Sequence, residues 1–209
     1  MAGYISDPVI RRLPAYYRHL RELEQEGTEQ ISSQDLGERM QLTPSQIRQD
    51  INSFGGVGRQ GYGYHVHTLK EHIRKLMGLD REHPMVILGA GRMGLAVANY
   101  TNFSREGFRT VAFFDRDPDR ISLTSERFPV YPAEELEARL PGMHAEIGVL
   151  AVPAAAAQEL LDRLYALGIR AIWNFAPVDL QAPRDMVVVN VHLSDSLHIL
   201  SYQIRNRDK

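Results

Sequence analysis

The chain has 209 residues, 44% of them hydrophobic, and a formal net charge of −2. This length and hydrophobicity exclude a disordered chain, and the absence of cysteine excludes disulfides, thiol switches and cysteine-ligated metal or iron–sulfur centres. Uninterrupted apolar runs are much shorter than the roughly 18 residues of a membrane span, and no apolar leader follows the first residues. We therefore expect a soluble, cytoplasmic protein with no membrane partner, in which any redox sensing depends on a bound molecule.

The first 79 residues predict three helices and a hairpin. Apolar side chains at three- and four-residue spacings predict an amphipathic helix over residues 9–23. A short helix over 32–40 has a serine cap, and a third, over 43–54, has Thr43 as its cap and proline in its first turn. Glycines and alternating aromatic residues predict a tight hairpin over 58–66.

The second and third helices match a helix-turn-helix, with the hairpin as a wing. Arginine and glutamine can pair with purine edges, and hydroxyl or amide groups can contact phosphates. Basic residues also outnumber acidic ones between Arg39 and Lys75. We therefore predict a DNA interface, and the alternative is a bundle with a structural or protein-binding role. The predicted DNA-binding residues are Thr43, Ser45, Gln46, Arg48, Gln49, Asn52, Arg59 and Tyr62.

A dinucleotide-binding fingerprint follows a predicted connecting helix over 67–82. The apolar run 85–88 is typical of a buried parallel strand, and it leads into three glycines, a helix and a second apolar run that ends in an acidic residue. The glycines permit a tight turn, a close approach of the pyrophosphate and helix packing, and the acidic group binds the ribose. A carboxylate repels a 2′-phosphate, so NAD(H) is favoured over NADP(H), although the neighbouring arginine leaves this open. The predicted residues are Gly89, Ala90, Gly91, Arg92, Met93, Gly94, Asp115 and Arg116.

The rest of the chain predicts further alternation of strands and helices. Strands over 145–152, 169–175 and 186–191 and a helix over 158–167 complete an α/β fold, a Rossmann-type doubly wound parallel sheet. Ligands of such sheets lie beyond the carboxyl ends of the strands. The two loops there are small and apolar, which favours the neutral reduced nicotinamide over the cationic oxidised ring. The alternative is that these loop residues only pack at the strand ends and bind no ligand. The predicted loop residues are Val152, Pro153, Phe175, Ala176 and Pro177.

Catalytic groups are what the sequence lacks. A dehydrogenase needs a proton donor or acceptor beside the nicotinamide, usually from a second domain, and here the only other domain is the basic helical one. None of the eight histidines has a triad or metal-ligand spacing. We therefore predict no catalytic residue, no metal and no enzyme. A small NAD-dependent oxidoreductase with an N-terminal dimerisation domain, and a regulator with another adenine nucleotide as effector, are the alternatives.

Several motifs, spread over nearly the whole chain and in the same order, resemble the Rex family of redox-sensing transcriptional repressors. They are Ser45-Gln46-Ile47-Arg48-Gln49-Asp50, Phe54-Gly55, Gly61-Tyr62-Gly63-Tyr64, Gly89-Ala90-Gly91, Phe114-Asp115-Arg116-Asp117-Pro118, Trp173-Asn174-Phe175-Ala176-Pro177 and Leu200-Ser201-Tyr202. The resemblance implies a homodimer that binds a palindromic operator in double-stranded DNA when the NADH/NAD+ ratio is low and leaves it when NADH binds.

The resemblance also implies that the C-terminal helix, about 195–205, is exchanged between subunits. An apolar stripe on this helix independently favours an interface. The resemblance suggests Arg18, Tyr100 and Asp195 as an allosteric polar relay, although Asp195 could instead be the helix N-cap. The predicted domains are a winged-helix DNA-binding domain over 1–79, a Rossmann NAD(H)-binding domain over 80–193 and the C-terminal helix over 194–209.

Overall fold

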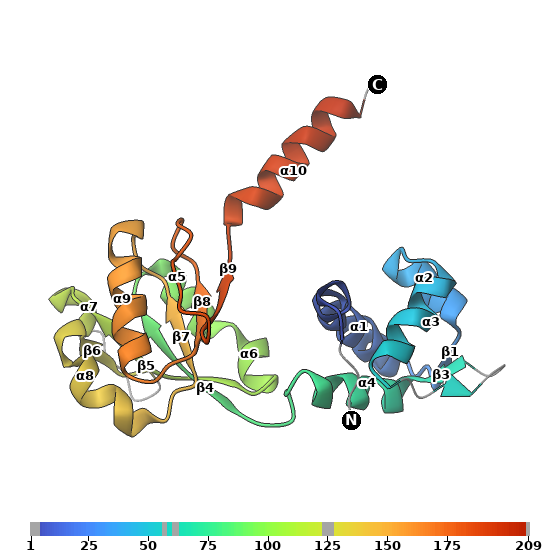
Figure 1. Cartoon of the computed structure of the whole chain (residues 1–209), viewed down its shortest axis with the longest axis horizontal. Coiled ribbons are helices and arrows are strands. Elements are labelled where there is room, and N and C mark those ends of the chain that lie inside the picture. Colours follow the sequence, from blue (N-terminus) through green and yellow to red (C-terminus); the bar gives the residue numbers. More distant parts are fainter. Residues whose placement is uncertain (1–4, 56–57, 60–62, 123–127, 208–209) are drawn as a thin grey trace. The chain divides into compact units, whose positions relative to one another are not determined.

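The computed structural model describes residues 5–55, 58–59, 63–122 and 128–207. The chain divides into two compact units, Met1–Arg81 and Glu82–Lys209 (Figure 1). Each unit has hydrophobic core clusters made only of its own residues. The functional assignment of 1–79, 80–193 and 194–209 as three domains stays a prediction.

The first unit consists of helices and a small antiparallel sheet with strand order β1-β3-β2. Helix α1 packs on α4, and α2 packs on α3. Its elements are α1 (Asp7–Gln25), β1 (Gln30–Ile31), α2 (Ser33–Met40), α3 (Pro44–Ser53), β2 (Gly58–Arg59), β3 (Gly63–His65) and α4 (Val66–Leu76). The predicted helix-turn-helix is therefore α2 and α3.

Local chemistry sets the turn between α2 and α3. The Ser32 hydroxyl accepts the Asp35 N–H at 3.0 Å, and the Thr43 hydroxyl accepts the Gln46 N–H at 3.2 Å, which confirms both predicted caps. A Cβ on Gly37 would lie 2.6 Å from the Leu42 carbonyl oxygen, so only glycine permits this close approach.

The predicted helix over 67–82 is wrong in its extent. Helix α4 ends at Leu76, and Gly78 follows with a φ of 73°, a left-handed conformation that stops a helix.

The second unit is built on a six-stranded parallel sheet with order β6-β5-β4-β7-β8-β9, which confirms the predicted α/β class. Its elements are β4 (His83–Leu88), α5 (Arg92–Asn99), α6 (Thr101–Arg105), β5 (Phe108–Asp115), α7 (Pro118–Ile121), β6 (Val130–Pro132), η1 (Ala133–Glu135), α8 (Leu136–Arg139), η2 (Leu140–Met143), β7 (Ile147–Leu150), α9 (Ala154–Ala166), β8 (Ala171–Asn174), β9 (Val187–Asn190) and α10 (Leu193–Asn206).

Helices cover both faces of this sheet (Figure 1). Alternate residues of β4 point to opposite sides: Val86 and Leu88 pack in the core with α8 and α9, whereas Met85 and Ile87 pack in the core with α5. The chain runs outward from β4 through β5 to β6 and then returns to β7 on the other side of β4. The switch point of strand order therefore lies between β4 and β7, where doubly wound sheets bind ligands.

The last helix, α10, has no buried residue. Its exposed apolar side chains are Leu193, Leu197, Ile199, Leu200, Tyr202 and Ile204. Its N-cap is His192 and Asp195 lies in its first turn, so the alternative reading of Asp195 as the N-cap is wrong. Within the described part of the chain, no helix is long and apolar enough to cross a membrane.

Candidate functional site

The glycine-rich turn connects β4 to α5 with little space around its backbone. Gly89 has a φ of 100°, and a Cβ there would lie 2.4 Å from the Ala151 carbonyl oxygen. A Cβ on Gly94 would lie 2.0 Å from the Gly89 carbonyl oxygen. These positions require glycine for the turn and for the packing of the helix on the strand, as the fingerprint predicts. Gly91 is the N-cap of α5, so the first backbone N–H groups of that helix face the turn.

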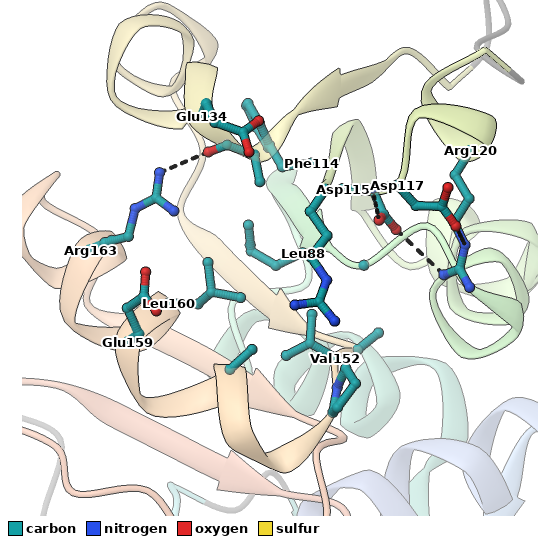
Figure 2. Close-up of a pocket in the computed structure, with 16 residues that line it drawn as sticks. Leu88, Phe114, Asp115, Asp117, Arg120, Glu134, Val152, Glu159, Leu160 and Arg163 are labelled. Atoms are coloured by element: carbon teal, nitrogen blue, oxygen red, sulfur yellow. Dashed lines mark hydrogen bonds and ion pairs between the residues drawn. The ribbon is translucent and has the colours of Figure 1, made fainter.

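Asp115 ends β5 beside this turn and is almost fully buried. Its Oδ2 accepts the Ala90 N–H at 2.6 Å, and its Oδ1 accepts the Asp117 N–H at 2.9 Å. The carboxylate is therefore tied to the backbone of the glycine turn, at the edge of a cavity (Figure 2).

Arg120, on the short helix α7, is a site residue that the sequence analysis missed. Its Nη1 lies 3.5 Å from Asp115 Oδ2, and its Nε lies 3.2 Å from Asp117 Oδ2. A Cβ on Gly91 would lie 2.7 Å from the same Nη1, so the guanidinium lies over the glycine turn. An arginine in the loop after the acidic residue was the only available signal, and it does not show that the side chain returns toward the turn.

A cavity of about 390 Å³ lies at the carboxyl ends of β4, β5 and β7, within the size range of ligand pockets. It brings together the predicted residues Gly89, Asp115, Arg116, Val152 and Pro153. The remaining predicted residues of the glycine turn and the loop over 175–177 do not line it. Leu88, Val152 and Leu160 form part of its apolar wall. Asp115, Asp117 and Arg120 form one polar end, and Glu134, Glu159 and Arg163 form the other (Figure 2).

This polar end was also missed, because its residues come from η1 and α9, far from the glycine motif in sequence. Arg163 donates to both carboxylate oxygens of Glu137, at 2.7 and 2.8 Å, and to the Ala133 carbonyl oxygen at 2.7 Å. The hydrogen bond to Glu137 raises the pKa of Arg163, so this group stays a cation.

The loop after β8 lies next to the loop after β7, since the Phe175 N–H donates to the Leu150 carbonyl oxygen at 2.9 Å. Asn174, which is fully buried and was not predicted, holds this loop. Its side chain accepts the Ala176 N–H at 3.0 Å and donates to the Val178 carbonyl oxygen at 2.8 Å. Ala176 is buried, whereas Pro177 is exposed.

The three predicted relay residues lie on different elements. Arg18 is in α1 of the first unit, Tyr100 is the half-exposed C-cap of α5, and Asp195 is in α10. The Tyr100 ring packs on Phe103 with 4.6 Å between ring centroids. The relay itself stays a prediction.

The second candidate surface is α3 in the first unit. Ser45, Arg48, Gln49 and Asn52 are exposed on it, and Gln46 is half-buried. The Arg48 Nη1 donates to the Ser33 hydroxyl at 3.0 Å, which joins α3 to α2. The exposed Thr43 precedes α3, with its hydroxyl 3.0 Å from that of Ser45. Tyr62 and the side chain of Arg59 lie outside the described residues.

An ion pair between the buried Asp50 and the half-buried Arg12 lies beneath this surface. Asp50 of α3 is fully buried and accepts two hydrogen bonds from Arg12, at 2.6 and 2.8 Å, and one from the Tyr16 hydroxyl at 3.0 Å. Burial opposes the charge, but the hydrogen bonds from Arg12, Gln46 and Tyr16 outweigh it and hold the pKa of Asp50 below its ordinary value. Burial and the neighbouring Asp50 raise the pKa of Tyr16, which stays neutral.

The described residues contain no group of three or more His, Asp or Glu side chains that could hold a metal ion. The arrangement offers two surfaces with different chemistry: a cavity with a carboxylate at a glycine turn, and a polar helix over a buried ion pair.

Comparison with known proteins assigns each unit separately. Residues 4–52 match the family model described as putative DNA-binding protein N-terminus, and residues 80–178 match the CoA binding domain. The redox-sensing transcriptional repressor Rex of Caldanaerobacter subterraneus subsp. tengcongensis is 46% identical over 98% of this chain and 91% of the relative. The Rex of Clostridioides difficile is 45% identical over 96% of both chains.

Solved structures agree over the same length. The crystal structure of RSP in complex with β-NAD+ and operator DNA has a TM-score of 0.92 and 45% identity, and covers 99% of this chain and 95% of that one. The structure of RSP in complex with β-NADH has a TM-score of 0.90 and 43% identity, and covers 99% of this chain and 97% of that one. With this identity over nearly its full length, the chain belongs to the Rex family of redox-sensing transcriptional repressors.

Proposed function

We propose that this protein is a transcriptional repressor that senses the NADH/NAD+ ratio, binds palindromic operator DNA as a homodimer and is released by NADH. The observation that carries the proposal is Asp115 at the glycine turn, in a chain whose other unit holds an exposed helix-turn-helix. Similarity to a repressor solved with both β-NAD+ and operator DNA supports it. We expect the protein to act in the cytoplasm, where such DNA is found.

The nucleotide site fits a dinucleotide. Asp115 would accept hydrogen bonds from the adenosine ribose hydroxyls, and the cradle at Gly91, which has no side chain, would admit the pyrophosphate to the first N–H groups of α5. Arg92 and Met93 follow in the first turn of α5. The apolar loops at 152–153 and 175–177 would enclose the nicotinamide. When bound, NADH would supply no chemical step here, because its role would be to select a conformation.

The DNA surface fits a recognition helix. The exposed polar residues of α3 would enter the major groove, with Thr43 and Ser45 near a phosphate and Arg59 and Tyr62 on the wing. The exposed apolar face of α10 supports a homodimer, because a second copy would remove it from water. Arg18, Tyr100 and Asp195 would relay the nucleotide state between the units.

The first test is fluorescence anisotropy of the operator duplex bound by the solved relative, at fixed salt, with NADH, NAD+ and NADPH added separately. We expect release by NADH only. Binding that ignores all three nucleotides would contradict the proposal and favour another effector, which competition by ATP or S-adenosylmethionine would test. Turnover of a hydroxy or carbonyl substrate would favour the oxidoreductase alternative, which family membership disfavours.

Reciprocity gives a second test. If NADH and operator select different conformations, saturating operator must weaken NADH binding by the same factor as NADH weakens operator binding, typically about 5- to 150-fold. An NADH affinity that saturating operator does not change would rule out a single coupled equilibrium.

A further inference from the structure

The starting observation is a difference between two glutamines on α3. Gln46 donates from its Nε2 to Asp50 Oδ1 at 2.7 Å, whereas the side chain of Gln49 is exposed and makes no hydrogen bond to any described residue. The same side chain thus occurs twice on one helix, once held and once free to rotate. Holding a side chain before binding removes the entropy that must otherwise be lost on contact.

The chemistry of Asp50 fixes which way the Gln46 amide points. An ionised carboxylate accepts hydrogen bonds and cannot donate them, so it must face the amide nitrogen of Gln46 and not its oxygen. Asp50 cannot turn away, because Arg12 binds both of its oxygens and Tyr16 binds Oδ2. The orientation of Gln46 is therefore set by a buried group anchored to α1.

The Gln46 amide keeps two groups free for another partner, its oxygen as an acceptor and one N–H as a donor. Asp50 takes one of the two amide hydrogens, and the Gln46 oxygen accepts no hydrogen bond within the described part of the chain. Adenine presents the complementary pair in the major groove, a donor at N6 and an acceptor at N7. Gln46 also lies in the N-terminal half of α3, the part of a recognition helix that contacts bases.

We infer that Asp50 is a positioning residue that orients Gln46 to read one adenine in each operator half-site. The inference rests on the proposed function, because it requires that α3 binds DNA. In this arrangement Gln46 contacts the base, whereas Arg12 and Tyr16 act only by holding Asp50 in place. One bidentate contact of this kind discriminates between bases by about 5- to 150-fold.

The experiment selects bound duplexes from a random library with the full-length protein and then measures binding to the selected duplex by anisotropy. Each selected adenine is replaced in turn by 7-deazaadenine, which lacks the N7 acceptor. We expect one adenine in each half-site to show a loss of about 5- to 150-fold, and we expect the loss to vanish in Gln46→Ala. Gln49→Ala is the matched control and should keep the full loss at that adenine.

Asp50→Asn tests the positioning role. An asparagine can donate as well as accept, so the Gln46 amide could turn over, and the preference for adenine at that one position should disappear while the other positions stay selective. Tyr16→Phe is the structural control, since it removes a hydrogen bond to Asp50 but keeps the carboxylate that orients Gln46. It should weaken the fold and leave the base preference unchanged.

The outcomes separate the two proposals. A wild-type protein that enriches no sequence would overturn the proposed function itself. Enrichment by wild type, with the same adenine preference in Asp50→Asn and only a uniform loss of affinity, would overturn the inference alone. If Asp50→Asn does not fold, the double variant Arg12→Gln/Asp50→Asn removes both charges together and leaves neither unpaired. The preference of this double variant for adenine at the same position then tests the inference.

Discussion

Among the residues that the structure describes, each unit buries one carboxylate, and the two differ in which groups satisfy the charge. Asp50 is 0% exposed and accepts hydrogen bonds from three side chains. Asp115 is 7% exposed and accepts from two backbone N–H groups, with Arg120 farther away at 3.5 Å. A carboxylate has about four acceptor positions, so Asp50 is saturated within the fold whereas Asp115 keeps capacity for a ligand.

The difference distinguishes a structural charge from a binding charge. A saturated buried ion pair is costly to break from one side, because the partner is left without a counter-charge. A carboxylate held by the backbone at the edge of a cavity can lose its side chain with less harm to the fold, because water can reach the freed N–H groups. Four variants or conditions test this distinction.

The largest effect is expected for Asp50→Ala. It would leave the half-buried Arg12 without a partner and the Tyr16 hydroxyl without an acceptor, and should lower the free energy of unfolding of the first unit by about 3 kcal/mol, the lower end of the range for buried pairs, because Arg12 is 28% exposed. Urea unfolding followed by far-ultraviolet circular dichroism would detect the loss. The single tryptophan, Trp173, lies in the second unit, so its fluorescence should report an unchanged transition. A loss below about 0.5 kcal/mol, the range of ordinary surface substitutions, would contradict the structural role of Asp50.

Asp115→Ala should weaken ligand binding and leave the fold intact. Loss of one net hydrogen bond between the charged carboxylate and the ribose, worth about 1.5–3 kcal/mol, should weaken NADH binding by about 10- to 150-fold. Operator affinity without nucleotide should stay at the wild-type value. Titration of NADH fluorescence and operator anisotropy measure the two quantities. Loss of both would instead indicate a folding defect and would erase the distinction between the two carboxylates.

The sequence predicts a site well when the residues in contact are close together in the chain. The glycine turn and Asp115 follow from spacing, because the backbone conformation at Gly89 and the packing at Gly94 need residues a few positions apart. The same is true of the caps at Ser32 and Thr43, each bonded to a backbone N–H three residues later. Local rules therefore predicted the glycine turn, the caps and the central strands of the sheet, but not β1, β6 or the short helices α6, α7 and α8.

The residues that were missed depend on long-range contacts. Arg12 and Asp50 are 38 positions apart, and an acidic residue in a polar helix gives no sign that it is buried. Arg163 reaches Glu137 across 26 positions, because α9 returns to the sheet beside η1 and α8. Such pairs appear only once the packing of helices is known, so propensity and periodicity could not have identified them.

A third effect is the response to acid. The pKa of Asp50 is lowered by folding, so its contribution to stability is fully present above its unfolded value of about 3.9 and is lost as the pH falls through the lower folded value. One group of this kind adds a slope of at most about 1.4 kcal/mol per pH unit. Urea unfolding of the first unit at pH 3 to 7 should therefore show a smaller difference between wild type and Asp50→Asn at the acid end. A difference that does not change with pH would contradict the assignment.

The smallest effect is expected for Arg120→Ala. This variant tests how Arg120 affects the discrimination by Asp115 between NADH and NADPH. The guanidinium lies near Asp115 and over Gly91, where it could offset the repulsion between that carboxylate and a 2′-phosphate. Arg120 is about half exposed, so such a contribution is limited to about 0.2–1 kcal/mol. We expect NADPH affinity to fall by about 2- to 5-fold and NADH affinity to change less, as measured by nucleotide fluorescence. Arg170→Ala, which removes an arginine paired with Asp185 away from the cavity, is the matched control. Equal losses for NADH and NADPH would show that Arg120 acts on a part common to both nucleotides, such as the pyrophosphate, and that the backbone-held carboxylate discriminates without its help.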